Sequence, residues 1–154
     1  MSLNKIIIGF IIILILFSGF ILLQLNKTNA PASKVTIDNQ TFSVEVATTS
    51  AQLQQGLSGR TSLPKDQGML FIFKTAAPYP FWMKDMKFPL DMIFINNNKI
   101  VTIFQNVPAP KDPNTTNLPV YAPDGPVNQV LEINAGLAKT DNFKKGDTVT
   151  VKLK

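Results

Sequence analysis

Hydrophobic positions form one long run near the amino terminus and many short runs after it. The long run covers residues 6–25, twenty positions without a charged side chain. At 1.5 Å per helical residue, such a run spans roughly 30 Å, the thickness of a bilayer's hydrocarbon core. We therefore expect residues 1–25 to form a single transmembrane helix, an uncleaved signal anchor, with a cleaved signal peptide as the alternative.

The charges around this run predict its orientation. Lys5 precedes the run, and Lys27 and Lys34 follow it. An excess of positive charge usually marks the cytoplasmic flank of a span. Here the two flanks carry nearly equal positive charge, so this rule alone does not set the orientation. The short amino-terminal tail with one Lys resembles the start of a Sec-type signal. We expect a single-pass protein of the cell membrane, with its amino terminus in the cytoplasm and its C-terminal domain extracytoplasmic.

After a polar linker, residues 26–34, the pattern becomes that of β-strands. Within residues 41–47, Phe42, Val44 and Val46 alternate with polar side chains, the period of a half-buried strand. Residues 68–73 are apolar on both faces, which predicts a central strand covered on both sides. We expect further strands at 35–38, 81–84, 91–95, 99–107, 129–134 and 148–153, a short helix at 51–57, and a short helix or a loop at 135–143.

This succession predicts a mostly β domain over residues 35–154. Seven or eight short strands separated by turns suit a compact, mostly antiparallel β-barrel or sandwich with one or two short helices. The connection at residues 105–128 is unusually long and carries six of the eleven Pro residues. Because such long loops are usually functional covers or flexible segments, its Val120 and Tyr121 suggest a part that docks on the domain.

Composition excludes several classes of function. From Val35 onward, 12 basic residues face 10 acidic ones without any basic run, so we expect no nucleic-acid binding. The chain has no Cys and no His, which excludes disulfides, Cys nucleophiles, Ser-His-Asp triads and the usual zinc sites. We expect no metal and no cofactor. The Met residues are better explained as core fillers than as ligands of a soft metal.

Residues 81–95, FWMKDMKFPLDMIFI, place aromatic, sulfur and charged side chains together. In an extended segment at 81–84, Trp82 and Lys84 share one face and Met83 lies on the other. Asp91 falls inside an apolar strand. If the protein has a site, we expect it in this segment.

A second carboxylate, Glu132, also falls inside an apolar strand, on the same face as Val130. Buried carboxylates need a cation or several hydrogen-bond donors. The available cations are Lys84 and Arg60, the only Arg in the chain, which either lies at the surface or holds a carboxylate with its planar fork.

Two interpretations of these charges stay open. They form a structural network, in which Asp91 accepts from backbone amides or pairs with Arg60, or they line a pocket for a small polar ligand. The candidate ligand-binding residues are Arg60, Trp82, Met83, Lys84, Asp91 and Glu132. The predicted function is a binding module for a small ligand or an envelope protein. The alternatives are an envelope enzyme acting on a glycan or peptide through Asp91 with Lys84 or Arg60, and a structural subunit of a membrane complex.

One set of short motifs resembles a known family. The motifs are Gly56-Leu57, Arg60, Gly68-Met69-Leu70-Phe71, Phe81-Trp82-Met83-Lys84, Pro89-Leu90-Asp91-Met92, Val130-Leu131-Glu132 and Gly136. Together they resemble domain-of-unknown-function family 192, over about residues 42–151. The resemblance implies a small β-rich domain, often behind a signal peptide or membrane segment, and no established reaction or ligand. Family members typically have Asn and a small residue where this chain has Asp85-Met86.

Overall fold

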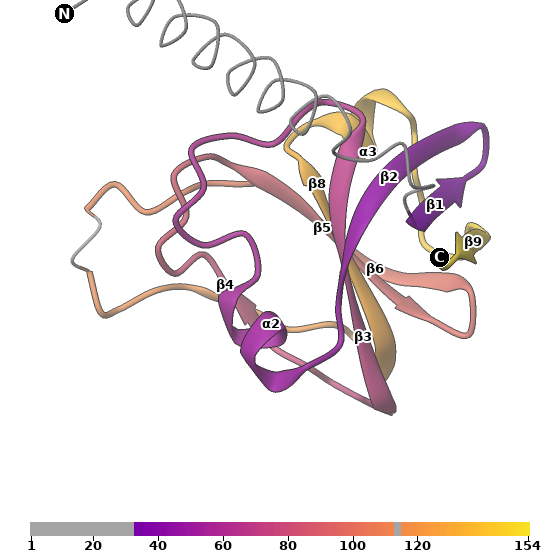
Figure 1. Ribbon diagram of the computed structural model, residues 1–154, viewed down its shortest axis with the longest axis horizontal. Helices are drawn as coiled ribbons and strands as arrows, with labels where there is room; N and C mark the ends of the chain where they lie inside the picture. The colour runs from indigo at the N-terminus through magenta and orange to yellow at the C-terminus, as the bar shows by residue number, and fades with distance from the viewer. Residues whose placement is uncertain (1–32, 113–114) are drawn as a thin grey trace, which may run out of the picture. The chain divides into compact units, whose positions relative to one another are not determined.

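The computed structural model describes residues 33–112 and 115–154 (Figure 1). The predicted membrane segment, residues 1–25, lies outside these ranges. Among the described residues, no helix has the length and apolar character needed to cross a membrane. In chain order the elements are β1 Ser33–Ile37, β2 Gln40–Ala47, α2 Ser50–Gln55, β3 Gln67–Ala77, β4 Phe81–Trp82, β5 Leu90–Asn96, β6 Lys99–Val107, β7 Val120–Tyr121, β8 Val127–Asn134, α3 Leu137–Thr140 and β9 Val149–Lys152.

Seven of these strands form one curled sheet in the order β6-β5-β8-β3-β2-β1-β9. Neighbouring strands are antiparallel, except that β2 and β3, which α2 connects, run parallel. An isolated bridge between Lys99 and Thr148 links the two end strands, so the sheet curls into a half-barrel (Figure 1). The prediction of a mostly β domain with two short helices is confirmed.

The two faces of the sheet bury two separate groups of hydrophobic side chains. We call the first the barrel cluster, to which all seven strands contribute: Val35, Ile37, Phe42, Val44, Leu70, Ile93, Ile95, Ile100, Leu131, Ile133, Ala138, Phe143 and Val149. We call the second the cover cluster: Ala47, Leu57, Leu63, Met69, Phe71, Met83, Met86, Leu90, Met92, Phe94, Val107, Val127 and Val130. Strand β3 contributes alternate residues to each, which confirms that it is covered on both faces.

The cover cluster is closed by segments outside the main sheet. Strand β4 pairs with β7, with Phe81 opposite Tyr121, in a separate two-stranded sheet. The long connection therefore does dock on the domain, as its Val120 and Tyr121 predict. The strand expected at 81–84 is shorter, because only Phe81 and Trp82 pair and Asp85 adopts a left-handed turn with φ of 56°.

Helix α2 begins at a capping box, in which Thr49 accepts from the backbone amide of Gln52 and the Gln52 side chain accepts in return from Thr49. Gly56 ends the helix at a positive φ of 48°. The following turn directs Leu57 into the cover cluster. The helix predicted at 51–57 is thus confirmed, and its capping fixes how it lies over the sheet.

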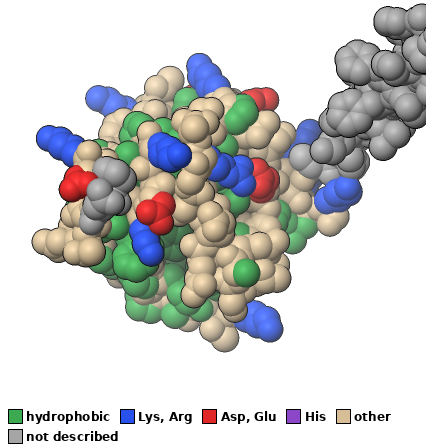
Figure 2. All heavy atoms as spheres, turned by 60° about the vertical axis from the view of Figure 1, so that its left-hand side comes forward, with side chains coloured by type: hydrophobic (Ala, Val, Ile, Leu, Met, Phe, Trp, Pro, Cys, Tyr) green, Lys and Arg blue, Asp and Glu red, His purple; other side chains and the backbone are tan. Residues whose placement is uncertain are grey.

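On the face that Figure 2 shows, basic side chains are spread rather than gathered. Figure 2 shows Lys and Arg standing singly on one face, with Asp and Glu between several of them, while hydrophobic side chains gather in one part of that face. The prediction that the protein does not bind nucleic acid stays a prediction.

Candidate functional site

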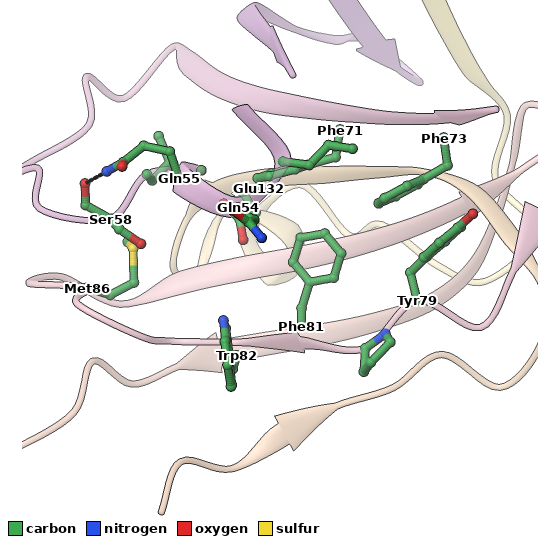
Figure 3. A pocket seen from close by; sticks show the side chains of 14 residues that line it. Gln54, Gln55, Ser58, Phe71, Phe73, Tyr79, Phe81, Trp82, Met86 and Glu132 are labelled. Carbon is green, nitrogen blue, oxygen red and sulfur yellow. Dashed lines mark hydrogen bonds between the residues drawn. The ribbon is translucent and has the colours of Figure 1, made fainter. Parts of the chain in front are cut away.

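A pocket of about 150 Å³ lies between α2 with its following turn, β3, β4 and β8 (Figure 3). Its 14 lining residues are Leu53, Gln54, Gln55, Gly56, Leu57, Ser58, Phe71, Phe73, Tyr79, Pro80, Phe81, Trp82, Met86 and Glu132. It is a gap in the cover cluster rather than in the barrel cluster. The ordered helix and the β4–β7 pair therefore frame its opening.

Packed aromatic rings make one wall of this pocket. Phe81 projects from β4 toward Phe71, with ring centroids 5.0 Å apart and perpendicular planes (Figure 3). Phe73 stacks on Tyr79 at a centroid distance of 3.7 Å. Phe81 also meets Phe94 edge-on at 5.6 Å, which ties the wall to β5. Rings held by several neighbours keep their positions, so the wall is largely pre-formed.

Glu132 is the one acidic side chain that lines the pocket. It projects from β8, with Met69 of β3 and Met92 of β5 as its two cross-strand neighbours. Only 5% of Glu132 is exposed, and its carboxyl group has no hydrogen-bond or ion-pair partner among residues 33–112 and 115–154. Burial in these apolar surroundings disfavours the charged form and raises the pKa of Glu132 to about 8.

Trp82 stands at the mouth of the pocket with 57% of its surface exposed. Beyond the mouth, the surface continues into a broad groove that Gln54, Gln55, Lys84 and Asp85 help to line. The groove shares Trp82 and the exposed side of α2 with the pocket. A small group can therefore enter the pocket while the rest of a larger molecule stays in the groove.

Asp91, by contrast, is enclosed completely. Its side chain is 0% exposed, and three backbone amides donate to its two oxygens. Oδ1 accepts from Asn106 at 2.7 Å and from Gly136 at 3.0 Å, and Oδ2 accepts from Ala138 at 2.8 Å. Asn106 lies where the β5–β6 register shifts and has a φ of 54°, and Gly136 has a φ of 86°, so Asp91 ties this irregular part of β6 to the turn that starts α3.

Arg60 pairs with Glu45 rather than with Asp91 or Glu132. Both guanidinium Nη atoms donate to the two carboxylate oxygens of Glu45, with 2.7 Å between Nη2 and Oε2. The hydrogen bond from Arg60 lowers the pKa of Glu45, and the same bond raises the pKa of Arg60. The planar-fork interpretation of Arg60 is supported, with an exposed carboxylate of the protein as its partner.

The structure therefore brings together only part of the predicted group. Trp82 and Glu132 line the pocket, and Lys84 lines the adjoining groove. Met83 is 2% exposed and packs in the cover cluster, where its neighbour Met86 also touches the pocket. Arg60 and Asp91 are engaged elsewhere.

Sequence reasoning missed the pocket's polar rim and most of its aromatic wall. The rim consists of Gln54, Gln55 and Ser58, and Gln55 donates to the backbone oxygen of Ser58 (Figure 3). These residues look like an ordinary solvated helix face in the sequence. The aromatic wall had one signal in the sequence: Phe71 and Phe73 are two residues apart, so they lie on the same face of β3.

No group of three acidic, His or Cys side chains suited to a metal ion occurs in the described part of the chain. Glu132 is a single carboxylate among apolar and amide side chains, so the pocket is suited to an organic ligand rather than to a hard cation, which requires several oxygen ligands.

Sequence comparison assigns the chain to a family. The profile of DUF192, described as an uncharacterized ACR, matches residues 33–151, which is most of the chain, and the chain belongs to this family. The resemblance noted in the motifs is thereby confirmed. No curated protein matches the chain.

Two solved structures resemble this one. A protein of unknown function from Novosphingobium aromaticivorans DSM 12444 is 33% identical, with a TM-score of 0.68 over 77% of this chain and 82% of its own. A protein from Sinorhizobium meliloti 1021, provisionally described as a transcription regulator, is also 33% identical, with a TM-score of 0.64 over 77% of this chain and 91% of its own.

Proposed function

We propose that this member of the DUF192 family is a binding module that takes a small organic ligand into the pocket between α2, β3, β4 and β8. The observation that carries the proposal is Glu132, a carboxyl group buried without a partner at a pocket with pre-formed aromatic walls. Native structures satisfy nearly all buried polar groups with protein or water, so a carboxyl group that lines a cavity without a protein partner leaves a position for a donor from solvent or a ligand. A ligand that hydrogen-bonds to Glu132 supplies that partner.

The mouth of the pocket supports the same proposal. An exposed Trp82 beside Gln54 and Gln55 offers a stacking surface next to amide donors and acceptors. Large exposed aromatic side chains beside a cavity are typical of recognition surfaces. The ligand is therefore small at its inner end and polar or amphipathic where it meets the groove.

We also propose that the module works at the cell envelope. The apolar run at residues 6–25 has the length of a membrane span, and the signal-like tail before it favours a C-terminal domain on the outer side. Protease protection in intact cells tests this location. Cleavage of the C-terminal domain by external protease supports it, and complete protection contradicts it.

A second candidate function is catalysis, with Glu132 in place of Asp91 as the acid. A carboxyl group whose pKa is raised to about 8 keeps its proton at neutral pH and can donate it, as general acids do. Asp91 is less suited, because three amides already occupy its oxygens. Lys84 lines the adjoining groove and is the cation that this candidate function would use.

The binding proposal can be tested with the chain's single Trp, which stands at the pocket mouth. We would screen a library of small polar fragments against the full-length protein in nonionic detergent, following the one indole N–H signal of Trp82 by NMR. Fragments that bind in the pocket should shift this signal saturably.

Two variants that each add a Phe ring, one at the pocket and one far from it, show whether binding is in the pocket. Gln54→Phe places a ring at the pocket mouth, whereas Thr150→Phe places one on the exposed side of β9. Fragment binding should be lost in Gln54→Phe and kept in Thr150→Phe. If no fragment shifts Trp82, or if both variants bind equally well, the pocket is not the binding site.

A further inference from the structure

We propose that the ligand presents a primary alkylammonium group to the pocket, so that its cationic nitrogen pairs with Glu132 inside the aromatic wall. This inference rests on the proposed function, because it names the chemical class that the same pocket accepts. Three features of the pocket support it: the lining has an acid but no Lys or Arg, its wall is aromatic, and the Glu132 carboxyl group receives no hydrogen bond from the described residues.

The lining carries charge of one sign only. Among the 14 lining residues, Glu132 is the only acid, and none is a Lys or an Arg. A carboxylate or phosphate ligand would meet no cation there and would face a group that becomes negative. An ammonium group instead meets an unopposed carboxylate in apolar surroundings, where a charge-assisted hydrogen bond is stronger than in water.

The aromatic wall favours a cation as well. Phe71, Phe73, Tyr79, Phe81 and Trp82 all contribute to the lining. The faces of such rings carry partial negative charge and attract Lys-type cations, most strongly where water is excluded. A neutral ligand of the same shape would gain the apolar contact but not this attraction.

A primary ammonium group also matches the available acceptors. It has three N–H donors, and the Glu132 carboxyl group has no partner among the described residues. The side-chain amides of Gln54 and Gln55, on the rim, offer further oxygen acceptors. A quaternary ammonium group has no N–H to give, so it would leave the buried carboxyl without a hydrogen bond.

Other charged groups lie outside the pocket lining. Lys84 and Asp85 line the adjoining groove and have opposite charges, and Glu45 and Arg60 neutralise each other in a depression beyond Gln55 and Gly56. Asp91, on the neighbouring strand, faces the barrel cluster with Ile93 rather than Glu132. Tyr79 is the other titratable group in the lining, and its hydroxyl donates to the backbone oxygen of Thr75 at 3.0 Å. The pH dependence of ligand binding should therefore follow Glu132.

The test compares three probes of similar size: n-butylammonium, 1-butanol and butanoate. Each is titrated into the full-length protein in nonionic detergent and phosphate buffer, so that no other ammonium is present, with Trp82 fluorescence and its indole NMR signal as readouts. At pH 9, n-butylammonium should bind at least about tenfold more tightly than 1-butanol, and butanoate should not bind.

The preference should also depend on pH. Alkylammonium groups stay protonated up to about pH 10. Glu132 must lose its proton to form the ion pair, so the affinity for n-butylammonium should fall as the pH drops from 9 to 6, by up to about tenfold per unit. In Glu132→Gln, which keeps the shape of the side chain, the preference for n-butylammonium over 1-butanol should shrink at least about tenfold at pH 9 and should no longer depend on pH.

The outcomes separate this inference from the proposed function. If wild-type protein binds 1-butanol as tightly as n-butylammonium, the ammonium inference is overturned and the pocket remains a binding site. If neither probe changes the Trp82 signals, the ammonium inference is again overturned. The fragment screen with Gln54→Phe then decides whether the pocket binds any small ligand. A preference that is undiminished and still depends on pH in Glu132→Gln overturns the role of Glu132.

The ammonium group can belong to a free amine or to a lysine side chain of a peptide. Nα-acetyl-lysine methylamide carries the same butylammonium group with peptide bonds attached. Tighter binding of this compound than of n-butylammonium indicates a peptide whose backbone lies in the groove beside Trp82 and Lys84. Weaker binding indicates a free amine, and both results keep the ammonium inference.

Discussion

Asp91 and Glu132 are both buried acids on adjacent strands of one sheet, yet their surroundings are opposite. In the β5–β8 register, Asp91 lies across from Ile133 and Met92 lies across from Glu132. One step along the strand turns a side chain to the other face. Asp91 therefore faces the barrel cluster, where three amides hold it, and Glu132 faces the cover cluster, where it has no partner among the described residues.

The difference teaches that burial of a charge does not by itself mark a site. A carboxylate that receives several amide hydrogen bonds is part of the framework, because those bonds stabilise it and it satisfies their donors in return. A carboxylate buried without donors lowers the free energy of unfolding of the protein. The role of such a carboxylate is therefore not to stabilise the fold. In this protein the carboxylate is Glu132, and it faces the pocket.

The largest effect should come from removing the framework acid. Asp91→Ala leaves the backbone amides of Asn106, Gly136 and Ala138 without their acceptor. We expect the free energy of unfolding to fall by about 4 kcal/mol, or folding to fail altogether. Urea denaturation followed by circular dichroism measures this loss.

Asp91→Asn is a more conservative version of the same test. The NH₂ group of the new Asn would face amide donors and could not accept from them, so this variant should also destabilise the protein strongly. If either variant is as stable as wild type, the framework role of Asp91 is wrong.

The next effect should be a dependence of stability on pH caused by Glu132. Its pKa is about 8 in the folded protein against an ordinary value of 4.5. Between these two pH values the unfolded chain has released a proton that the folded protein still binds. The free energy of unfolding should therefore be highest below pH 4.5 and fall as the pH rises, by at most ~1.4 kcal/mol per unit, for a total on the order of 5 kcal/mol.

Chemical denaturation of wild type and Glu132→Gln between pH 4 and 9 isolates this contribution. The difference in unfolding free energy between the two proteins should change with pH across that window and level off above it. A difference that stays constant means that Glu132 has a partner in solution, which would remove the contrast with Asp91.

A smaller effect of opposite sign should follow when Glu132 is made apolar. Glu132→Met continues the row of Met69 and Met92 across the neighbouring strands and removes an unpaired polar group. At pH 7 we expect the free energy of unfolding to rise by about 1–2 kcal/mol while ligand binding is lost. Thermal melts and the Trp82 titration measure both. A destabilised Glu132→Met would show that the acid serves the fold.

The smallest effect concerns the exposed pair of Arg60 and Glu45, which serves as a reference for both buried acids. Their side chains are 36% and 55% exposed, so water screens the interaction. Arg60→Gln should lower the free energy of unfolding by less than about 1 kcal/mol. A loss above about 2 kcal/mol would contradict this assignment.

The same pair should also make stability depend on pH. The pKa of Glu45 is lowered, so its contribution to the free energy of unfolding is present above pH 4.5 and is lost as the pH falls, opposite in direction to that of Glu132.

Periodicity predicted most of the fold. The alternation in β2, the apolar run in β3 and the turn at Asn97 and Asn98 are local signals, and the structure contains each of them. The same periodicity placed Glu132 on the face of Val130, which is correct. The parallel pairing of β2 with β3 was not predicted, because it depends on how α2 crosses over the sheet rather than on any local pattern.

The partners of the charged residues could not be predicted in the same way. The sequence offers Arg60 and Lys84 as cations for Asp91 and Glu132, but pairing depends on distances between segments far apart in the chain. Asp91 is satisfied by backbone amides, a donor that every residue except proline carries and that composition therefore cannot reveal.

The position of β1 also has a consequence for when the domain can fold. Strand β1 pairs on one side with β2, which follows it directly, and on the other side with β9, the last strand of the chain. Its first pairing can form early in synthesis, whereas the second must wait until residues 149–152 have been made. Long-range pairings of this kind slow folding. This strand order keeps the sheet incomplete until β9 is available to pair with β1.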